Sequence, residues 1–319
     1  MGKPRPIAGD GSVGMPVAAV AGVIAAASFV VSTFLHRRGQ NASMPRWQAT
    51  ISALSAVALT IAFAGVTALG VLLASEVLGV GLQGLQLSPL GGGLLAGVAS
   101  ALAGRLTFAA GIGLRTADLA ALLFSYLVIG TLFAMITAAD PRWWERNFSQ
   151  LGIGAGAWAF NGTLLVAGIL TATVGSYIGR DLHRIRGDSA LSRIAWVVVL
   201  WAATGVALAA IGLFPLERSA LLHNIAAFST LILFVAAGVI TTLLIPGPPR
   251  PLLLTTIGIA LLLVVACVLA FGFRLFAITV LEAVVIGLGL LWLTTLVRIL
   301  AVLTPAGSRP SARRSLMRG

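Results

Sequence analysis

Long runs of apolar residues constrain this chain more than any other feature. The segment 251–272, for example, contains no charged residue. A helix needs about 20 mainly apolar residues to cross the hydrocarbon core of a bilayer. Strands of membrane barrels are shorter, about ten residues, and alternate between polar and apolar side chains. The runs here are apolar on every side, so they predict an all-α, polytopic transmembrane helix bundle.

The composition agrees with a membrane protein. Hydrophobic residues make up 59% of the 319 residues and charged residues only 9%, whereas a soluble domain usually has about 25% charged residues. The single cysteine, Cys267, lies in an apolar run and excludes a disulfide within the chain. One lysine stands against twenty arginines, and this bias indicates a GC-rich bacterial genome. We therefore expect a multi-pass protein of the bacterial plasma (inner) membrane.

The number of spans depends on one ambiguous segment. Eight runs are clear, at 15–35, 48–75, 117–138, 151–178, 193–213, 222–245, 251–272 and 275–302. A ninth, at 88–110, is apolar and long enough but is rich in glycine and interrupted by Arg105. The loops 36–47 and 179–193 are both strongly basic, and basic loops face the cytoplasm. They lie on one side only if the ninth run also crosses, so we predict nine spans.

The charges indicate the orientation of these nine spans. With the N-terminus outside, fifteen arginines and three acids lie inside, whereas six basic and six acidic residues lie outside. Lys3 and Arg5 oppose this orientation, but Arg37, Arg38 and Arg46 follow the first span and outnumber them. The inner-face arginines are expected to contact anionic lipid. Since the basic residues lie in loops and the tail, we expect no nucleic-acid partner.

The expected organisation has three parts. Residues 1–115 form an N-terminal three-helix membrane segment, residues 116–303 a six-helix core, and residues 304–319 a flexible basic cytoplasmic tail. Within the fifth span, the pair Gly175 and Gly179 has the spacing that favours close helix packing, as does the pair Gly152 and Gly156.

Known catalytic motifs are absent from the sequence. It contains no HExxH, no P-loop and no GxSxG. Two of the three histidines, His36 and His183, lie in predicted inner loops, and the third, His223, lies on the outer side. We therefore expect no metal site and no cofactor. The sequence favours a protein without catalytic activity, although a Glu–His acid/base pair stays open.

The outer loop DPRWWERNFSQLGIGAGAWAFNGT (140–163) is the best functional clue. If the span begins at residue 151, Gln150 and Asn161 share one stripe of the helix, and Asn161 lies about 15 Å below the surface. A polar amide at that depth needs partners inside the bundle. We expect His223 to face Asn161 and Gln150, and Arg274 to pair with Glu282.

These groups gather in the outer half of the predicted bundle. The candidate ligand-binding residues are Glu145, Gln150, Asn161, Glu217, His223, Asn224, Arg274 and Glu282. Polar groups at one end of an apolar bundle suit an amphipathic ligand, with its head on the polar groups and its tails along the helices. The alternative also stays open, namely hydrogen bonds between helices and ordinary rim charges.

Four short motifs resemble one family. They are NFSQLG (147–152), FN (160–161), GLFP (212–215) and LLHN (221–224). The chain resembles, over about 117–303, the bacterial family catalogued as domain of unknown function 998. More distantly, it is similar to the eukaryotic DRAM/Frag/Sfk-type six-helix membrane proteins. The resemblance carries over to Ser149, Gly152, Asn161 and His223, and it adds Ser149 to the candidate ligand-binding residues.

The resemblance implies a role in lipid handling rather than one reaction. The expected function is an integral inner-membrane protein that binds or helps handle lipid, or that is a subunit or scaffold of an envelope complex with a membrane-protein partner. Two alternatives stay open. One is a transporter of a small molecule or lipid, and the other is an enzyme that acts on lipid or glycan at the outer face.

Overall fold

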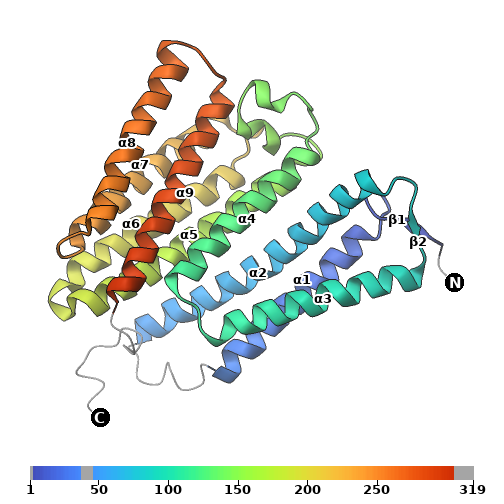
Figure 1. Ribbon diagram of the computed structural model, residues 1–319, viewed down its shortest axis with the longest axis horizontal. Coiled ribbons are helices and arrows are strands. Elements are labelled where there is room, and N and C mark those ends of the chain that lie inside the picture. Colours follow the sequence, from blue (N-terminus) through green and yellow to red (C-terminus); the bar gives the residue numbers. More distant parts are fainter. Residues whose placement is uncertain (1–2, 37–45, 305–319) are drawn as a thin grey trace. The chain divides into compact units, whose positions relative to one another are not determined.

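The computed structural model describes residues 3–36 and 46–304, and helices dominate both ranges (Figure 1). Nine helices in these ranges are long and apolar enough to cross a membrane. They are α1 (Gly14–His36), α2 (Arg46–Gly81), α3 (Pro89–Ile112), α4 (Thr116–Ile136), α5 (Ala157–Arg186), α6 (Leu191–Leu213), α7 (Ala220–Leu244), α8 (Arg250–Cys267) and α9 (Ile278–Leu303). The predicted bundle and its nine spans are confirmed. The predicted tail and most of the basic loop 36–47 lie outside the described residues.

Packing divides the chain into two units, and the division falls within α4. The first unit contains residues 1–114 and 125–136, and the second contains residues 115–124 and 137–319. The predicted boundary at residue 115, directly before the core, stays a prediction.

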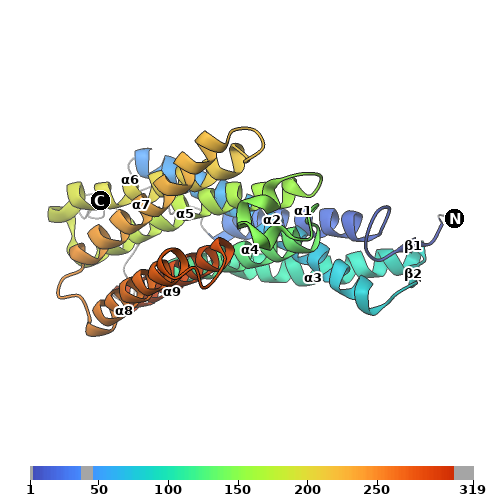
Figure 2. The same ribbon diagram turned by 90° about the horizontal axis from the view of Figure 1, so that it is seen from above.

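In the first unit, α1 packs against both α2 and α3 (Figures 1 and 2). Two short strands, β1 (Arg5–Pro6) and β2 (Gln86–Leu87), pair antiparallel next to the beginning of α3. The ambiguous glycine-rich segment forms α3 because its start is well capped. Ser88 Oγ accepts a hydrogen bond from the N–H of Gly91 at 3.2 Å, and Pro89 occupies the first position of the helix, where no N–H is needed.

In the second unit, α5 and α6 approach closely because glycines line their contact. A Cβ atom on Gly168 would lie 2.3 Å from the carbonyl oxygen of Gly205. A Cβ atom on Gly175 would lie 2.1 Å from the Cβ atom of Trp201 in α6. A Cβ atom on Gly179 would also lie too close to a side chain of α6. Small residues let two backbones approach in a membrane. The close packing predicted for Gly175 and Gly179 is confirmed.

The remaining helices of this unit share an aromatic core. Phe234 of α7 lies edge-on to Trp201 of α6 and to Trp292 of α9, with ring centroids 5.5 and 5.9 Å away. Trp201 donates its indole N–H to Thr241 at 3.1 Å, and Trp292 donates to Thr256 at 2.9 Å. A buried indole N–H needs such a partner, so the two threonines make these tryptophans compatible with the apolar bundle.

The predicted start of the fifth span was wrong. Residues 148–152 form a short 3-10 helix, and α5 begins only at Ala157. Gly154 between them has a φ of +78°, a left-handed conformation that interrupts a helix. Gln150 and Asn161 therefore do not share a helical stripe. Asn161 lies about 6 Å along α5, rather than the predicted 15 Å below the surface. Gly152 and Gly156 likewise lie before α5 and form no helix-packing pair.

Candidate functional site

The loop before α5 is docked on its own unit by side chains from several helices. We call residues 144–154 the docked loop. Glu282 of α9 accepts a hydrogen bond from the N–H of Phe148 at 2.7 Å. Glu217, between α6 and α7, accepts one from the N–H of Gly154 at 2.9 Å. The carboxyl oxygens accept these hydrogen bonds, so the two acids hold both parts of the loop in place.

Two neutral side chains complete the docking. Thr279 of α9 donates its hydroxyl to the carbonyl of Trp144 at 2.7 Å. Asn161 of α5 donates its side-chain N–H to the carbonyl of Gly152 at 3.2 Å. Side chains thus satisfy four backbone groups of the loop, as the low-dielectric end of a bundle requires.

His223 bridges the docked loop and the turn after α6. Its Nε2 lies 2.8 Å from Ser149 Oγ, and its Nδ1 lies 3.0 Å from the carbonyl oxygen of Phe214. Only 2% of His223 is exposed, whereas Ser149 is half-buried. A buried imidazole needs partners for both nitrogens, and this arrangement supplies them.

The four motifs of the sequence resemblance meet at this place. Gly212 of the GLFP motif packs on the backbone of Asn161, where a Cβ atom would lie 2.3 Å from the Asn161 carbonyl oxygen. This contact places the next turn, with Phe214, beside the first turn of α7. His223 of the LLHN motif then connects Phe214 to Ser149 of the NFSQLG motif.

Two side-chain oxygen atoms, one in the docked loop and one in α5 next to it, accept no hydrogen bond within the described residues. Asn147 Oδ1 and Asn161 Oδ1 are buried and accept no hydrogen bond from the described residues. Asn147 directly precedes the 3-10 helix, and its side chain does not cap that helix. Buried acceptors without a partner are uncommon in proteins, so these two amides have capacity for an additional donor.

The structure brings together five of the nine predicted site residues. Four of them contact the docked loop, and the fifth belongs to it. They are Ser149, Asn161, Glu217, His223 and Glu282. Ligand binding by these residues stays a prediction, as does a cavity among them.

The other four predicted residues are placed differently. Gln150 accepts a hydrogen bond from Arg146 at 3.2 Å, whereas the hydrogen-bond partners of the His223 ring in the described chain are Ser149 and Phe214. Glu145, Asn224 and Arg274 are exposed. Within ranges 3–36 and 46–304, no ion pair joins Arg274 to Glu282. That predicted pair was wrong because α9 begins only at Ile278 and Glu282 turns toward the backbone of Phe148.

Two residues at this site, Thr279 and Asn147, were not predicted from the sequence. Thr279 stands three residues before Glu282, so both lie on one face of α9. This spacing was visible in the sequence and would have linked the two. Asn147 had no comparable signal, because its burial depends on how the loop folds back.

A second polar cluster lies at the other end of this unit. Asp181 is only 5% exposed and accepts a hydrogen bond from the Thr116 hydroxyl. Arg180 and Arg184 lie 3.7 and 3.6 Å from its other oxygen. The predicted loop at 179–193 included Asp181, but α5 continues to Arg186, so this part of the loop prediction was wrong. The cluster therefore joins α4 to the end of α5, and burial of Asp181 is compensated by two cations.

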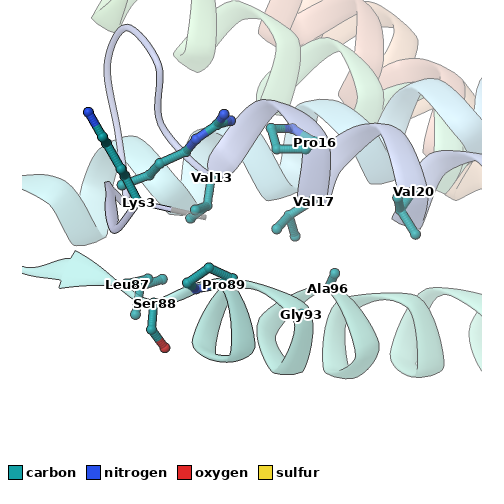
Figure 3. A pocket seen from close by; sticks show the side chains of 12 residues that line it. Lys3, Val13, Pro16, Val17, Val20, Leu87, Ser88, Pro89, Gly93 and Ala96 are labelled. Atoms are coloured by element: carbon teal, nitrogen blue, oxygen red, sulfur yellow. The ribbon is translucent and has the colours of Figure 1, made fainter. Parts of the chain in front are cut away.

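The first unit contains a cavity of about 380 Å³ between α1 and α3 (Figure 3). We call it the N-terminal cavity. Lys3 and Arg5 line it together with apolar side chains of α1, among them Val17 and Val20. On the α3 side it is lined by small residues, including Gly93. The cavity was not predicted from the sequence, where Lys3 and Arg5 were interpreted only as charges that oppose the predicted orientation.

The described residues hold no group of three or more His, Cys, Asp or Glu side chains placed to bind a metal ion. Nine apolar helices instead define the chain as a multi-pass α-helical membrane protein.

The chain belongs to the family described as protein of unknown function (DUF998). The family model matches residues 118–299, more than half of the chain. The match includes the docked loop and confirms the family resemblance seen in the four motifs. No curated protein and no solved structure matches the chain significantly.

Proposed function

We propose that this membrane protein binds an anionic lipid in the N-terminal cavity. The lipid phosphate lies on Lys3 and Arg5, and an acyl chain follows the apolar walls between α1 and α3. The observation that carries this proposal is the composition of the cavity, with two cations and otherwise mainly apolar or small lining residues. An apolar pocket with a few charged groups suits an amphipathic ligand.

The two cations are available for a ligand. Within the part of the chain that the structure describes, neither Lys3 nor Arg5 forms an ion pair. Both are exposed. A basic residue near a bilayer surface contributes about 1 kcal/mol to attraction for anionic lipid, so the pair favours a phosphate over a neutral head group.

The small residues of α3 leave room for the acyl chain. A Cβ atom on Gly93 would meet no atom within 4 Å, so the helix surface is open at this point. Val17 and Val20 of α1 line the same cavity (Figure 3). Each buried CH₂ group contributes about 0.8 kcal/mol, and an apolar groove of this kind therefore supports tail binding.

We also propose that the N-terminus faces the outside of a bacterial plasma membrane. Four crossings separate Lys3 from the docked loop, so both lie outside, and nine crossings separate Lys3 from Thr304, which therefore lies inside. Arg180, Arg184 and Arg193 then face the cytoplasm, in agreement with the positive-inside rule. These arginines supply a basic inner surface for anionic lipid.

The proposal is tested by lipid retention. The full chain is purified in nanodiscs of phosphatidylcholine and phosphatidylglycerol, and retained lipid is identified by native mass spectrometry. We expect phosphatidylglycerol to be enriched, and the Lys3→Gln and Arg5→Gln changes to reduce its affinity about fivefold each. Arg218→Gln is the control, since Arg218 is exposed and does not line the cavity. If the variant that carries both Lys3→Gln and Arg5→Gln retains as much phosphatidylglycerol as the control, the proposal is overturned.

A further inference from the structure

We propose that Ser149 and His223 form a nucleophile–base pair for acyl transfer from an ester of a membrane lipid that carries a free hydroxyl group. The Ser149 hydroxyl is the nucleophile and His223 Nε2 is the general base. This inference goes beyond lipid binding in the N-terminal cavity. It rests on other residues in the second unit and stands or falls independently.

The hydrogen bonds of His223 define which nitrogen is the base. The Phe214 carbonyl can only accept, so Nδ1, 3.0 Å away, carries the imidazole proton and donates it. In a neutral imidazole, Nε2 is then an acceptor. The Ser149 hydroxyl at 2.8 Å must therefore donate to Nε2. This is the direction of proton transfer that activates a serine nucleophile.

A third group orients the base. In serine hydrolases a carboxylate commonly holds the imidazole through its other nitrogen. Here the backbone carbonyl of Phe214 occupies that position. It fixes the same tautomer and ring orientation, although it contributes no negative charge.

Both partners are held before any substrate arrives. Phe148 is bound through its N–H to Glu282 and Gly152 through its carbonyl to Asn161, so both ends of the 3-10 helix that carries Ser149 are fixed. His223 lies in the first turn of α7, and its own N–H donates to the Ser219 carbonyl at 3.0 Å. Such preorganisation is what a reacting pair requires.

The surroundings indicate the substrate class. Asn147 Oδ1 and Asn161 Oδ1 are buried acceptors without a donor, one directly before and one beside the 3-10 helix. A hydroxyl of a glycerol or sugar head group supplies such a donor. Leu221, Leu222 and Ile225 at the beginning of α7 are exposed apolar side chains, and they favour an acyl chain. An acylated glycerol or sugar fits both observations.

The chemistry balances with one co-reactant, either water or a second alcohol. His223 Nε2 takes the Ser149 proton while Oγ bonds to the ester carbonyl carbon. The bond from that carbon to the alcohol oxygen then breaks, and Nε2 returns the proton to the departing alcohol. Water, or a second hydroxyl, next attacks the serine ester. His223 takes its proton and returns it to Ser149 Oγ, so the acyl group leaves as an acid or a new ester.

A purely structural hydrogen bond is the alternative, and reactivity separates the two. The full chain in detergent is treated with a fluorophosphonate, which forms a P–O bond with activated serines and releases fluoride. We expect labelling at Ser149, identified by peptide mass spectrometry. Labelling disappears in Ser149→Ala and slows about 10²–10⁴-fold in His223→Gln, which removes the base. Ser219→Ala is the matched control, because Ser219 lies at the same end and only caps α7.

A second variant keeps the proposal testable if Ser149→Ala fails to fold. Ser149→Cys, in a Cys267→Ala background, retains a nucleophile of similar size. Its reaction with iodoacetamide at neutral pH should be at least tenfold faster with His223 than with His223→Gln. An unlabelled serine in folded wild-type protein would overturn the proposal. The same conclusion follows if His223→Gln leaves both reactions unchanged.

Discussion

Gly152 and Asn161 touch each other where the docked loop meets α5. A Cβ atom on Gly152 would lie 2.7 Å from Asn161 Oδ1, while the Asn161 N–H donates to the Gly152 carbonyl at 3.2 Å. The same amide therefore both binds the loop and prevents any larger residue from replacing the glycine. This contact closes the loop over the beginning of α5.

Gly152→Ala is expected to lower the free energy of unfolding by about 1–3 kcal/mol, because the added methyl group overpacks the contact. Gly162→Ala is the control. A Cβ atom there meets nothing within 4 Å, and removing a glycine from a helix interior stabilises it by about 1 kcal/mol. Thermal unfolding in detergent measures both. A neutral result for Gly152→Ala would contradict the contact.

Glu282 should tolerate glutamine but not leucine. Glutamine keeps an acceptor for the Phe148 N–H, whereas leucine leaves that buried donor unsatisfied at a cost of about 1–3 kcal/mol. Arg274→Leu should change stability little, because Arg274 is exposed and unpaired with the acid within the described chain. Melting temperature and proteolysis of the docked loop report these changes. Equal losses of stability for Arg274→Leu and Glu282→Leu would instead support the ion pair that was predicted from the sequence.

The N-terminal cavity can be filled from α3, because a Cβ atom on Gly93 meets no atom within 4 Å. Gly93→Leu places a side chain in the open space along α3 and should reduce lipid retention at least fivefold. Gly97→Leu adds the same side chain one turn further on, where a Cβ atom also meets nothing, but Gly97 does not line the cavity. Retained phosphatidylglycerol, measured by native mass spectrometry, distinguishes them. If both variants lose lipid equally, the cavity is not the binding site.

The proposed orientation predicts which surface positions a membrane-impermeant thiol reagent can reach. In a Cys267→Ala background, Arg218→Cys should be labelled in intact cells and Ser189→Cys only after the membrane is opened. Both positions are exposed and lie between helices, so access depends on the side of the membrane. Labelling of Ser189→Cys in intact cells would contradict the proposed orientation.

The number of membrane helices could be predicted from the sequence because it depends on the length of each apolar run. That property is local, and each run contributes independently. Even the ambiguous segment at 88–110 was assigned correctly, because the charges on either side of the membrane must be consistent. Family membership was equally visible, since four short motifs carry it.

Helix ends were less predictable. The segment 151–156 is apolar and its sequence predicts the start of a helix. Gly154 adopts a positive φ, however, and the chain before it belongs to the docked loop, so the helix starts later. Hydropathy records how apolar a residue is and not its backbone conformation. The prediction that Gln150 and Asn161 share one face of a single helix was therefore wrong.

Only the tertiary structure decided which polar groups meet. Glu282 binds a backbone N–H that lies 134 residues earlier, and His223 binds a serine 74 residues earlier. The sequence identified these side chains as unusual in an apolar bundle, because a buried polar group must find a partner wherever it lies. The sequence alone does not show which group that partner is. A hydrogen bond requires a distance below about 3.2 Å, and the packing of whole helices determines which groups come that close.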